Sequence, residues 1–411
     1  MKSDRSKIKE NLLDIISACE DLDEKDTGSG FLTGRAGVLL FLSTAYKEGV
    51  FSDSKNKLES LVNSIVGEEL SREAEKSITL CDGQVGIFYV LLFLYDSNLL
   101  DNSKISYLDL YDSLIIEKVF SEIEENNLDL LHGALGMISY LIYRFNLGFI
   151  LVDKMNHFLN GIIEAIDRKK ISFQEIGFVW KSKFDSVNDA SKFNLGAAHG
   201  LASLLLFFSK LSKLEKVSLN FSLLQTLITG CLSTFKIIFI QNVRIQQQSI
   251  FPSFCSFKEV DRSNSTRLAW CYGDLSIGYS IIMGAKSIGD KIFFNLGKRI
   301  CLNTTKRIHK NAGVLDAGFC HGASGLAVLY DLIRKETNDP LFEDSIKYWA
   351  IRSLKFAQFE DGLAGYKTYN NDHIEWENNY SLLEGISGIG YSYLYFRNRL
   401  NNDLLKSLFL I

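Results

Sequence analysis

A short motif recurs along the chain: two glycines three residues apart, followed by an apolar stretch. In the first copy Gly34 and Gly37 precede VLLFLSTAY, and a later copy places Gly133 and Gly136 before MISYLIYRF. Between the motifs, segments such as LFEDSIKYWAIRSLKFAQF carry apolar residues at three- and four-residue spacing, the period of an amphipathic helix. Each interval of roughly 50 to 70 residues therefore has room for two helices and a connection.

Seven copies of this motif are present. Their glycines are Gly34 and Gly37, Gly83 and Gly86, Gly133 and Gly136, Gly200, Gly273 and Gly278, Gly322 and Gly325, and Gly385 and Gly388. The fourth copy has Ala202 near the second glycine position, and the fifth is stretched by two residues. Repeats of this period are typical of stacked or circular architectures. We predict that most of these glycines serve packing, because glycine lets one backbone pass close to another.

Two intervals between motifs are longer than the others. One contains ISFQEIGFVWKSKFD, which alternates weakly like a strand, and the next contains KIIFIQNVRIQQQSIFPSF, rich in β-branched and aromatic residues. We expect a small insertion with some strand content, contributed by about residues 170–192 and 236–266. It would cap the repeats or grip a partner, and a plain β-hairpin excursion is the alternative.

Composition limits the class of protein. The 411 residues are 46% hydrophobic, enough for a sizeable core, and the net charge of −4 argues against a nucleic-acid partner, which requires a basic surface. Seven cysteines without framework spacing suit a reducing compartment. The longest apolar run covers residues 87–95, well short of the about 20 residues of a spanning helix. We expect a cytoplasmic protein without a membrane-spanning segment.

Two glycine-flanked segments contain cysteine and histidine, residue types that commonly bind metals. Cys271 lies in Trp270-Cys271-Tyr272-Gly273, and Cys320 and His321 lie together before Gly322. Three protein ligands without an evident fourth are typical of a catalytic zinc site, which keeps one position open. A single buried cysteine is also a common small hydrophobic residue, so the residues alone leave both interpretations open.

With these repeats and these two segments, the chain resembles the lanthionine synthetase C-like family over nearly its whole length, from Gly34 to Gly388. The resemblance implies an all-α fold, an α/α toroid of seven inner and seven outer helices formed by one domain over residues 1–411. It also implies a Zn²⁺ ion at one mouth, held by Cys271, Cys320 and His321. Family members of this kind carry an inserted domain of SH2-like shape, for which the insertion above is a candidate.

The implied activity is that of a stand-alone lantibiotic cyclase. Such an enzyme adds cysteine thiols of a dehydrated precursor peptide to dehydroalanine or dehydrobutyrine and forms lanthionine or methyllanthionine rings. Seven repeats leave no room for a dehydratase module. The implied partners are therefore the precursor peptide, a separate dehydratase and an exporter, which would associate this cytoplasmic protein with a membrane-bound biosynthetic complex.

The resemblance also assigns three catalytic residues: His199, Asp129 and Arg267. His199 would protonate the enolate carbon, because histidine donates a proton near neutral pH. Asp129 would orient or stabilise His199, and Arg267 would fix Asp129 or hold the enolate oxygen. His132, which also precedes a repeat glycine, competes with His199 for the role of acid. Without the resemblance, we would interpret Asp129 as a helix cap and His199 as a packed core residue.

Other functions stay open at this point. One is a different zinc-thiolate alkylating enzyme on an α/α barrel, either prenyltransferase-like or a relative that adds glutathione to dehydroamino acids. Another is a zinc-stabilised scaffold that binds peptides without catalysis. A pure scaffold would not need His199 and Asp129 beside intact metal ligands, which separates it from the cyclase.

Overall fold

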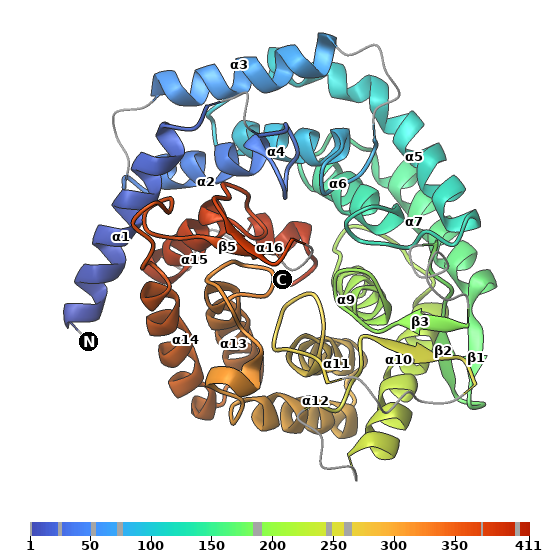
Figure 1. Ribbon diagram of the computed structural model, residues 1–411. Coiled ribbons are helices and arrows are strands. Elements are labelled where there is room, and N and C mark those ends of the chain that lie inside the picture. The colour runs from blue at the N-terminus through green and yellow to red at the C-terminus, as the bar shows by residue number, and fades with distance from the viewer. Residues whose placement is uncertain are drawn as a thin grey trace. The chain divides into compact units, whose positions relative to one another are not determined.

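The computed structural model describes residues 2–23, 27–50, 55–71, 77–183, 191–243, 249–258, 265–370, 373–398 and 403–411. These residues are mainly helical with a few short strands, as the apolar pattern predicts (Figure 1). The chain forms two compact units. Unit 1 comprises Met1–Leu108, Val314–Asp331 and Glu343–Leu404, and unit 2 comprises Asp109–Gly313, Leu332–Phe342 and Leu405–Ile411.

Unit 1 contains four repeat helices and their outer neighbours. Its elements are α1 (Lys2–Glu20), α2 (Arg35–Lys47), α3 (Lys55–Ser71), α4 (Gln84–Asp96), η1 (Asn102–Lys104), η2 (Ser106–Leu108), α13 (Ala323–Thr337, which continues into unit 2), α14 (Glu343–Lys355), β5 (Thr368–Asn370), β6 (Glu375–Glu377) and α15 (Ile386–Asn398). Helix α2 packs against α4 and α15, while α1 and α3 pack on the outside of α2 (Figure 1). Strands β5 and β6 form an antiparallel hairpin.

Unit 2 contains the other three repeat helices. Its elements are α5 (Asp109–Glu124), α6 (Ala134–Asn146), α7 (Val152–Lys169), β1 (Ile171–Phe173), β2 (Gly177–Val179), β3 (Lys192–Asn194), α9 (Leu201–Leu211), α10 (Phe221–Asn242), β4 (Phe254–Ser256), α11 (Asp274–Ile288), α12 (Lys291–Thr304), η3 (His309–Ala312) and η4 (Pro340–Phe342). The short α16 (Asp403–Ser407) leads into the C-terminal residues. Helix α9 packs against α10 and α11, and α11 packs along α12.

All seven glycine motifs mark the start of a helix, which confirms the repeat. Helices α2, α4, α6, α9, α11, α13 and α15 each begin directly after the first glycine of a copy. Their residues are almost all buried, as in α2, where every residue from Arg35 to Ala45 is shielded from solvent. An α-helix that is apolar on all sides belongs in a core. These seven helices are therefore the core elements of their units.

The first glycine of each copy stands where a side chain would collide with the preceding loop. Before α2 the loop folds back, and the carbonyl of Gly28 accepts a hydrogen bond of 2.8 Å from the N–H of Arg35. A β-carbon on Gly34 would lie 2.2 Å from the same carbonyl oxygen. The same fold-back bond precedes α4, α6 and α15. A backbone carbonyl thus satisfies one of the unpaired N–H groups of the helix start, in place of a capping side chain.

The stretched fifth copy has a different explanation. Gly278 does not face the preceding loop but the crossing of α11 with α12, where a β-carbon would lie 2.6 Å from Cys301 Sγ. On the other helix, a β-carbon on Gly297 would lie 2.8 Å from the carbonyl oxygen of Gly278. The second glycine of this copy therefore allows two helices to approach closely, which is a second use of the same residue type.

Within unit 1 the repeat turns are joined by backbone hydrogen bonds. The N–H of Leu32, in the first turn, donates to Cys81 O in the second turn (2.7 Å). The N–H of Leu383, in the seventh turn, donates to Leu32 O (2.9 Å), and the N–H of Cys320, in the sixth, donates to Leu383 O (2.7 Å). The last repeat of the sequence is therefore the direct neighbour of the first.

The long intervals contain strands, with one difference from the prediction. Strands β1 and β2 pair with each other, and β3 pairs with β4, so the two intervals are hydrogen-bonded together. Residues 236–242, predicted to be strand-like, form the end of α10 instead. Ile228, Phe235 and Ile238 are fully buried at helical spacing on α10, so burial of one helix face outweighs the β-branched composition. The single domain and the inserted subdomain stay predictions.

Helix α10 also meets the length and composition of a membrane span, over residues Phe221–Asn242. Of its most apolar window, 61% is buried inside the protein. A buried core helix passes the same test, so this is weak evidence for a membrane segment.

Candidate active site

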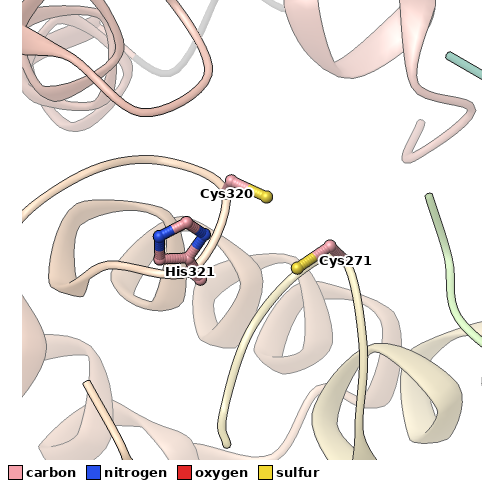
Figure 2. Close-up of side chains that lie close together, drawn as sticks. All are labelled: Cys271, Cys320 and His321. Atoms are coloured by element: carbon pink, nitrogen blue, oxygen red, sulfur yellow. The ribbon is translucent and has the colours of Figure 1, made fainter. Parts of the chain in front are cut away.

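The three predicted metal ligands lie together. One ligand atom from each of Cys271, Cys320 and His321 lies within 4.8 Å of the other two, and all three residues are buried. The two sulfur atoms and the imidazole ring face a common space (Figure 2). Cys271 lies in the turn before α11, and the other two lie in the turn before α13. This cluster could bind a metal ion.

Asp316 holds the turn that carries His321. One carboxylate oxygen accepts the N–H of Gly318 (3.0 Å), and the other accepts the N–H of Tyr369 on β5 (3.3 Å). The second oxygen also lies 3.9 Å from Nε2 of His321, and a carboxylate oxygen of Glu384 lies 3.8 Å from Nδ1. The imidazole thus lies between two acidic side chains, which favour a fixed ring orientation.

His199 and Asp129 form a hydrogen-bonded pair, as their predicted roles require. Nδ1 of His199 lies 2.6 Å from one carboxylate oxygen of Asp129, which is 2% exposed. The other carboxylate oxygen accepts the N–H groups of Leu131 (2.7 Å) and His132 (2.8 Å). Both oxygens of Asp129 are therefore engaged. With Nδ1 bound to a carboxylate, the Nε2 atom of His199 is the nitrogen that can meet a substrate.

Backbone bonds connect this pair with Cys271. The N–H groups of Ala197 (2.9 Å) and Ala198 (3.3 Å), in the turn before α9, donate to the carbonyl of Cys271. The ring of Tyr272 lies 6.1 Å from the ring of His199. Gly273 follows with a positive φ of 92°, a conformation that favours glycine. The turn that carries His199 is thereby fixed against the turn that carries Cys271.

Arg267 does not join this pair. Its residue lies beside η3, where the neighbouring Leu268 N–H donates to Ala312 O (2.8 Å). Within the part of the chain that the structure describes, the guanidinium of Arg267 forms no hydrogen bond or ion pair with Asp129. The structure gives the task of fixing Asp129 to backbone N–H groups instead. A catalytic role for Arg267 stays a prediction.

A different arginine supports the Cys271 turn. Arg307, which is largely buried, donates to the carbonyl of Thr266 and lies 3.7 Å from the carboxylate of Asp274. That carboxylate, at the first residue of α11, accepts the N–H groups of Ile250 (3.0 Å) and Phe251 (2.9 Å). Burial raises the pKa of Asp274, and these donors and Arg307 oppose the rise. No sequence motif predicted this interaction between Arg307, Asp274 and the loop backbone.

An asparagine that the sequence analysis missed begins three of the turns. Asn127, Asn194 and Asn379 each stand six residues before a repeat glycine, in NLDLLHG, NLGAAHG and NYSLLEG. Their side chains bond their own loops: Asn127 Nδ2 donates to His132 O (3.0 Å), and Asn194 Oδ1 accepts the N–H of Gly196 (2.8 Å). Asn194 Nδ2 also donates to the hydroxyl of Tyr272 (3.1 Å). This six-residue spacing is present in the sequence and could have predicted these turns.

Comparison with known proteins identifies the family. The chain matches the family described as lanthionine synthetase C-like protein over residues 2–97 and 26–410. This chain belongs to the lanthionine synthetase C-like family. Family membership confirms the identification made from the glycine repeat and the two cysteine segments. It also confirms the predicted enzyme class, a lanthionine synthetase.

A solved structure gives the fold. The chain is similar to nisin cyclase, with a TM-score of 0.71 and 21% sequence identity, over 98% of this chain and 97% of that protein. The likeness confirms the predicted all-α fold class, the helical toroid of the family. None of the curated proteins matches this chain in sequence.

Proposed function

We propose that this protein is a zinc-dependent peptide cyclase, which adds cysteine thiols of a dehydrated precursor peptide to dehydroalanine or dehydrobutyrine. One observation carries the proposal. The Cys271 turn, which supplies a ligand of the metal cluster, is hydrogen-bonded through its carbonyl to the turn that presents His199. This contact supports the proposal, because it would keep a metal-binding group close to a proton donor.

The three ligands suit a zinc ion. Two cysteines and one histidine are a donor set that zinc prefers, and they leave a fourth tetrahedral position for a substrate. At a zinc–sulfur bond length of about 2.3 Å, two tetrahedral thiolates stand about 3.8 Å apart. The observed spread of 4.8 Å or less among the ligand atoms is close to this arrangement. Bound zinc would lower the pKa of an incoming thiol and so supply a thiolate nucleophile.

His199 would supply the proton that completes the reaction. A new C–S bond forms at the β-carbon of the dehydrated residue, and the electrons of its double bond move to the α-carbon and the carbonyl oxygen as an enolate. The protonated imidazole of His199 then transfers its Nε2 proton to the α-carbon. Asp129, which is hydrogen-bonded to Nδ1, holds the ring in place and stabilises its protonated form.

The partners and the location follow from this function. The substrate would be a lantibiotic precursor already dehydrated by a separate dehydratase, and an exporter would receive the product. We propose a cytoplasmic protein that associates with these membrane-bound partners. The relative named nisin cyclase supports the peptide substrate.

Metal analysis and a ring-formation assay test the proposal together. The purified protein should contain about one zinc per chain, as a three-ligand catalytic site requires. With a dehydrated precursor peptide, it should abolish alkylation of the peptide thiols without changing the peptide mass. Cys320→Ala should lose both zinc and ring formation and yet remain folded, because the buried helices stabilise the chain.

Cys231→Ala is the matched control. Cys231 is a fully buried free cysteine on α10, outside the metal cluster. This variant should keep both zinc and ring formation. Full zinc content in Cys320→Ala, or zinc in the wild type far below one per chain, would contradict the proposed metal site.

A further inference from the structure

The position before each repeat glycine is where the turns present polar side chains. His199, Tyr272 and His321 occupy this position in the fourth, fifth and sixth copies. The turns around them are buried, while His199 and Tyr272 are partly exposed. His321 belongs to the metal cluster, and His199 is the proposed acid. The same position in the third copy is held by His132, whose side chain is also partly exposed.

The structure places His132 beside His199. The two imidazole rings are nearly parallel, with an angle of 6° between their planes and 6.1 Å between their centres. Tyr272 lies near His199 at the same centre distance of 6.1 Å. Asp129 connects the two histidines, since one oxygen accepts the backbone N–H of His132 and the other bonds Nδ1 of His199. Asp129 therefore fixes the position of the His132 backbone relative to the His199 ring.

We propose that His132 is a positioning residue that returns a proton to His199 after each ring closure. The inference rests on the proposed cyclase function. With 6.1 Å between the two ring centres, one water molecule would link a nitrogen of each ring by hydrogen bonds. His132 is partly exposed and can exchange protons with solvent. A second imidazole serves well here because a ring nitrogen can either donate or accept a proton.

The protons balance over one cycle. The peptide thiol loses its proton to solvent, the C–S bond forms, and His199 transfers a proton to the α-carbon. Neutral His199 then takes a proton from protonated His132 through the bridging water. Neutral His132 takes a proton from solvent, equal to the one that the thiol released. The enzyme ends the cycle as it began, with no further reactant.

Other charged groups face this pair and set its environment. Asp129 favours the protonated form of His199, and Lys181 lines a cavity of about 20 Å³ together with Asp129 and His199. Glu122 accepts a hydrogen bond of 2.6 Å from Asn127, whose amide also holds the carbonyl of His132. Lys118 pairs with Glu122 at 2.7 Å. Charged groups of both signs therefore lie near the pair.

The substitution His132→Gln tests the inference, because glutamine keeps hydrogen-bonding groups but carries no proton at neutral pH. In a single turnover with excess enzyme at mildly acidic pH, the variant should match the wild type, since His199 begins protonated. In repeated turnover its rate should fall by about 10-fold or more, less than the 10²–10⁴ expected for loss of the acid itself. The loss should grow as the pH rises, and added imidazole should restore the rate.

The control is His157→Gln, which changes an exposed histidine on α7 and should leave both rates unchanged. Zinc content and circular dichroism establish that both variants fold. Wild-type rates for His132→Gln at every pH would overturn the inference. So would an equal loss in single and repeated turnover that imidazole does not restore, which would indicate a purely structural role. Failure of the wild type to form rings would instead overturn the proposed function on which the inference rests.

Discussion

At the scale of single residues, different groups of the site orient the proposed acid and carry out the proton transfer. One carboxylate oxygen of Asp129 accepts two backbone N–H groups, and the other bonds His199. The orientation of the His199 ring is therefore fixed before a substrate binds. Preorganised groups of this kind need no rearrangement during the reaction. Backbone hydrogen bonds from Ala197 and Ala198 to the Cys271 carbonyl join the two turns, and these bonds do not depend on the identity of the His199 side chain.

Removing the acid should therefore leave the metal site intact. In His199→Asn the new side chain can still donate to Asp129 but has no nitrogen equivalent to Nε2. We expect full zinc content and a loss of ring formation of about 10²–10⁴, the usual worth of a positioned acid. Zinc analysis and the thiol-alkylation assay on the same preparation check both expectations. Ring formation at the wild-type rate would exclude His199 as the acid.

The residues of the site differ in how far the sequence could predict them. Cys271, Cys320 and His321 come from short motifs within glycine turns, and the turns bring their ligand atoms together as predicted. Arg267 was assigned from the family resemblance, which matches a position in the sequence but does not determine where a long side chain points. Among the described residues it forms no hydrogen bond or ion pair with Asp129, which bonds His199 as predicted and also two backbone N–H groups that no sequence pattern reveals.

At the scale of elements, the glycine turn is the unit that builds the fold. In the turns before α2, α4, α6, α13 and α15, a loop carbonyl accepts a hydrogen bond from the first N–H of the buried helix, and the first glycine makes room for the loop. The repeat alone predicted where these helices begin. The end of α10 did not, because its β-branched residues 236–242 favour strand locally while the buried face of the helix decides the outcome.

Two glycine substitutions in unit 1 should have opposite effects. A β-carbon on Gly83 would lie 2.3 Å from both Ser77 O and Thr79 N, so Gly83→Ala must displace the loop before α4. We expect it to lower the free energy of unfolding by more than about 1 kcal/mol, as overpacking does. Gly67 lies exposed within α3 with no atom within 4 Å of an added β-carbon. Gly67→Ala should raise the free energy by about 0.5–1 kcal/mol, through better helix propensity.

Urea unfolding of the two variants and the wild type, followed by circular dichroism, measures the difference. The two substitutions add the same methyl group, so the comparison isolates the space around it. A stabilising effect of Gly83→Ala would show that the loop can move aside at no cost. The close approach would then not explain why glycine stands there.

At the scale of the whole molecule, the repeat is completed by residues distant in sequence. In unit 1 the seventh turn bonds the first, through Leu383 and Leu32. In unit 2 the C-terminal residues 405–411 pack against three repeat helices. Ser139 on α6 donates to Ser407 O (3.1 Å), Lys210 on α9 donates to Ile411 O (2.9 Å), and the hydroxyl of Tyr279 on α11 donates to Leu410 O. Burial lowers the pKa of Lys210 at this contact.

This C-terminal segment should therefore be part of the core of unit 2. Leu408 is fully buried, and the neighbouring Phe409 lies 5.5 Å from the ring of Phe207 on α9. Leu408→Ala should lower the free energy of unfolding by about 2–5 kcal/mol, the cost of a cavity in a packed core. Leu110, on α5, is 81% exposed, and Leu110→Ala should stay within about 0.5 kcal/mol of the wild type. The urea midpoint, followed by circular dichroism, measures both. Because the two variants lose the same atoms in the same unit, their difference reports burial alone, and equal midpoints would mean that α6, α9 and α11 hold together without the C-terminal segment.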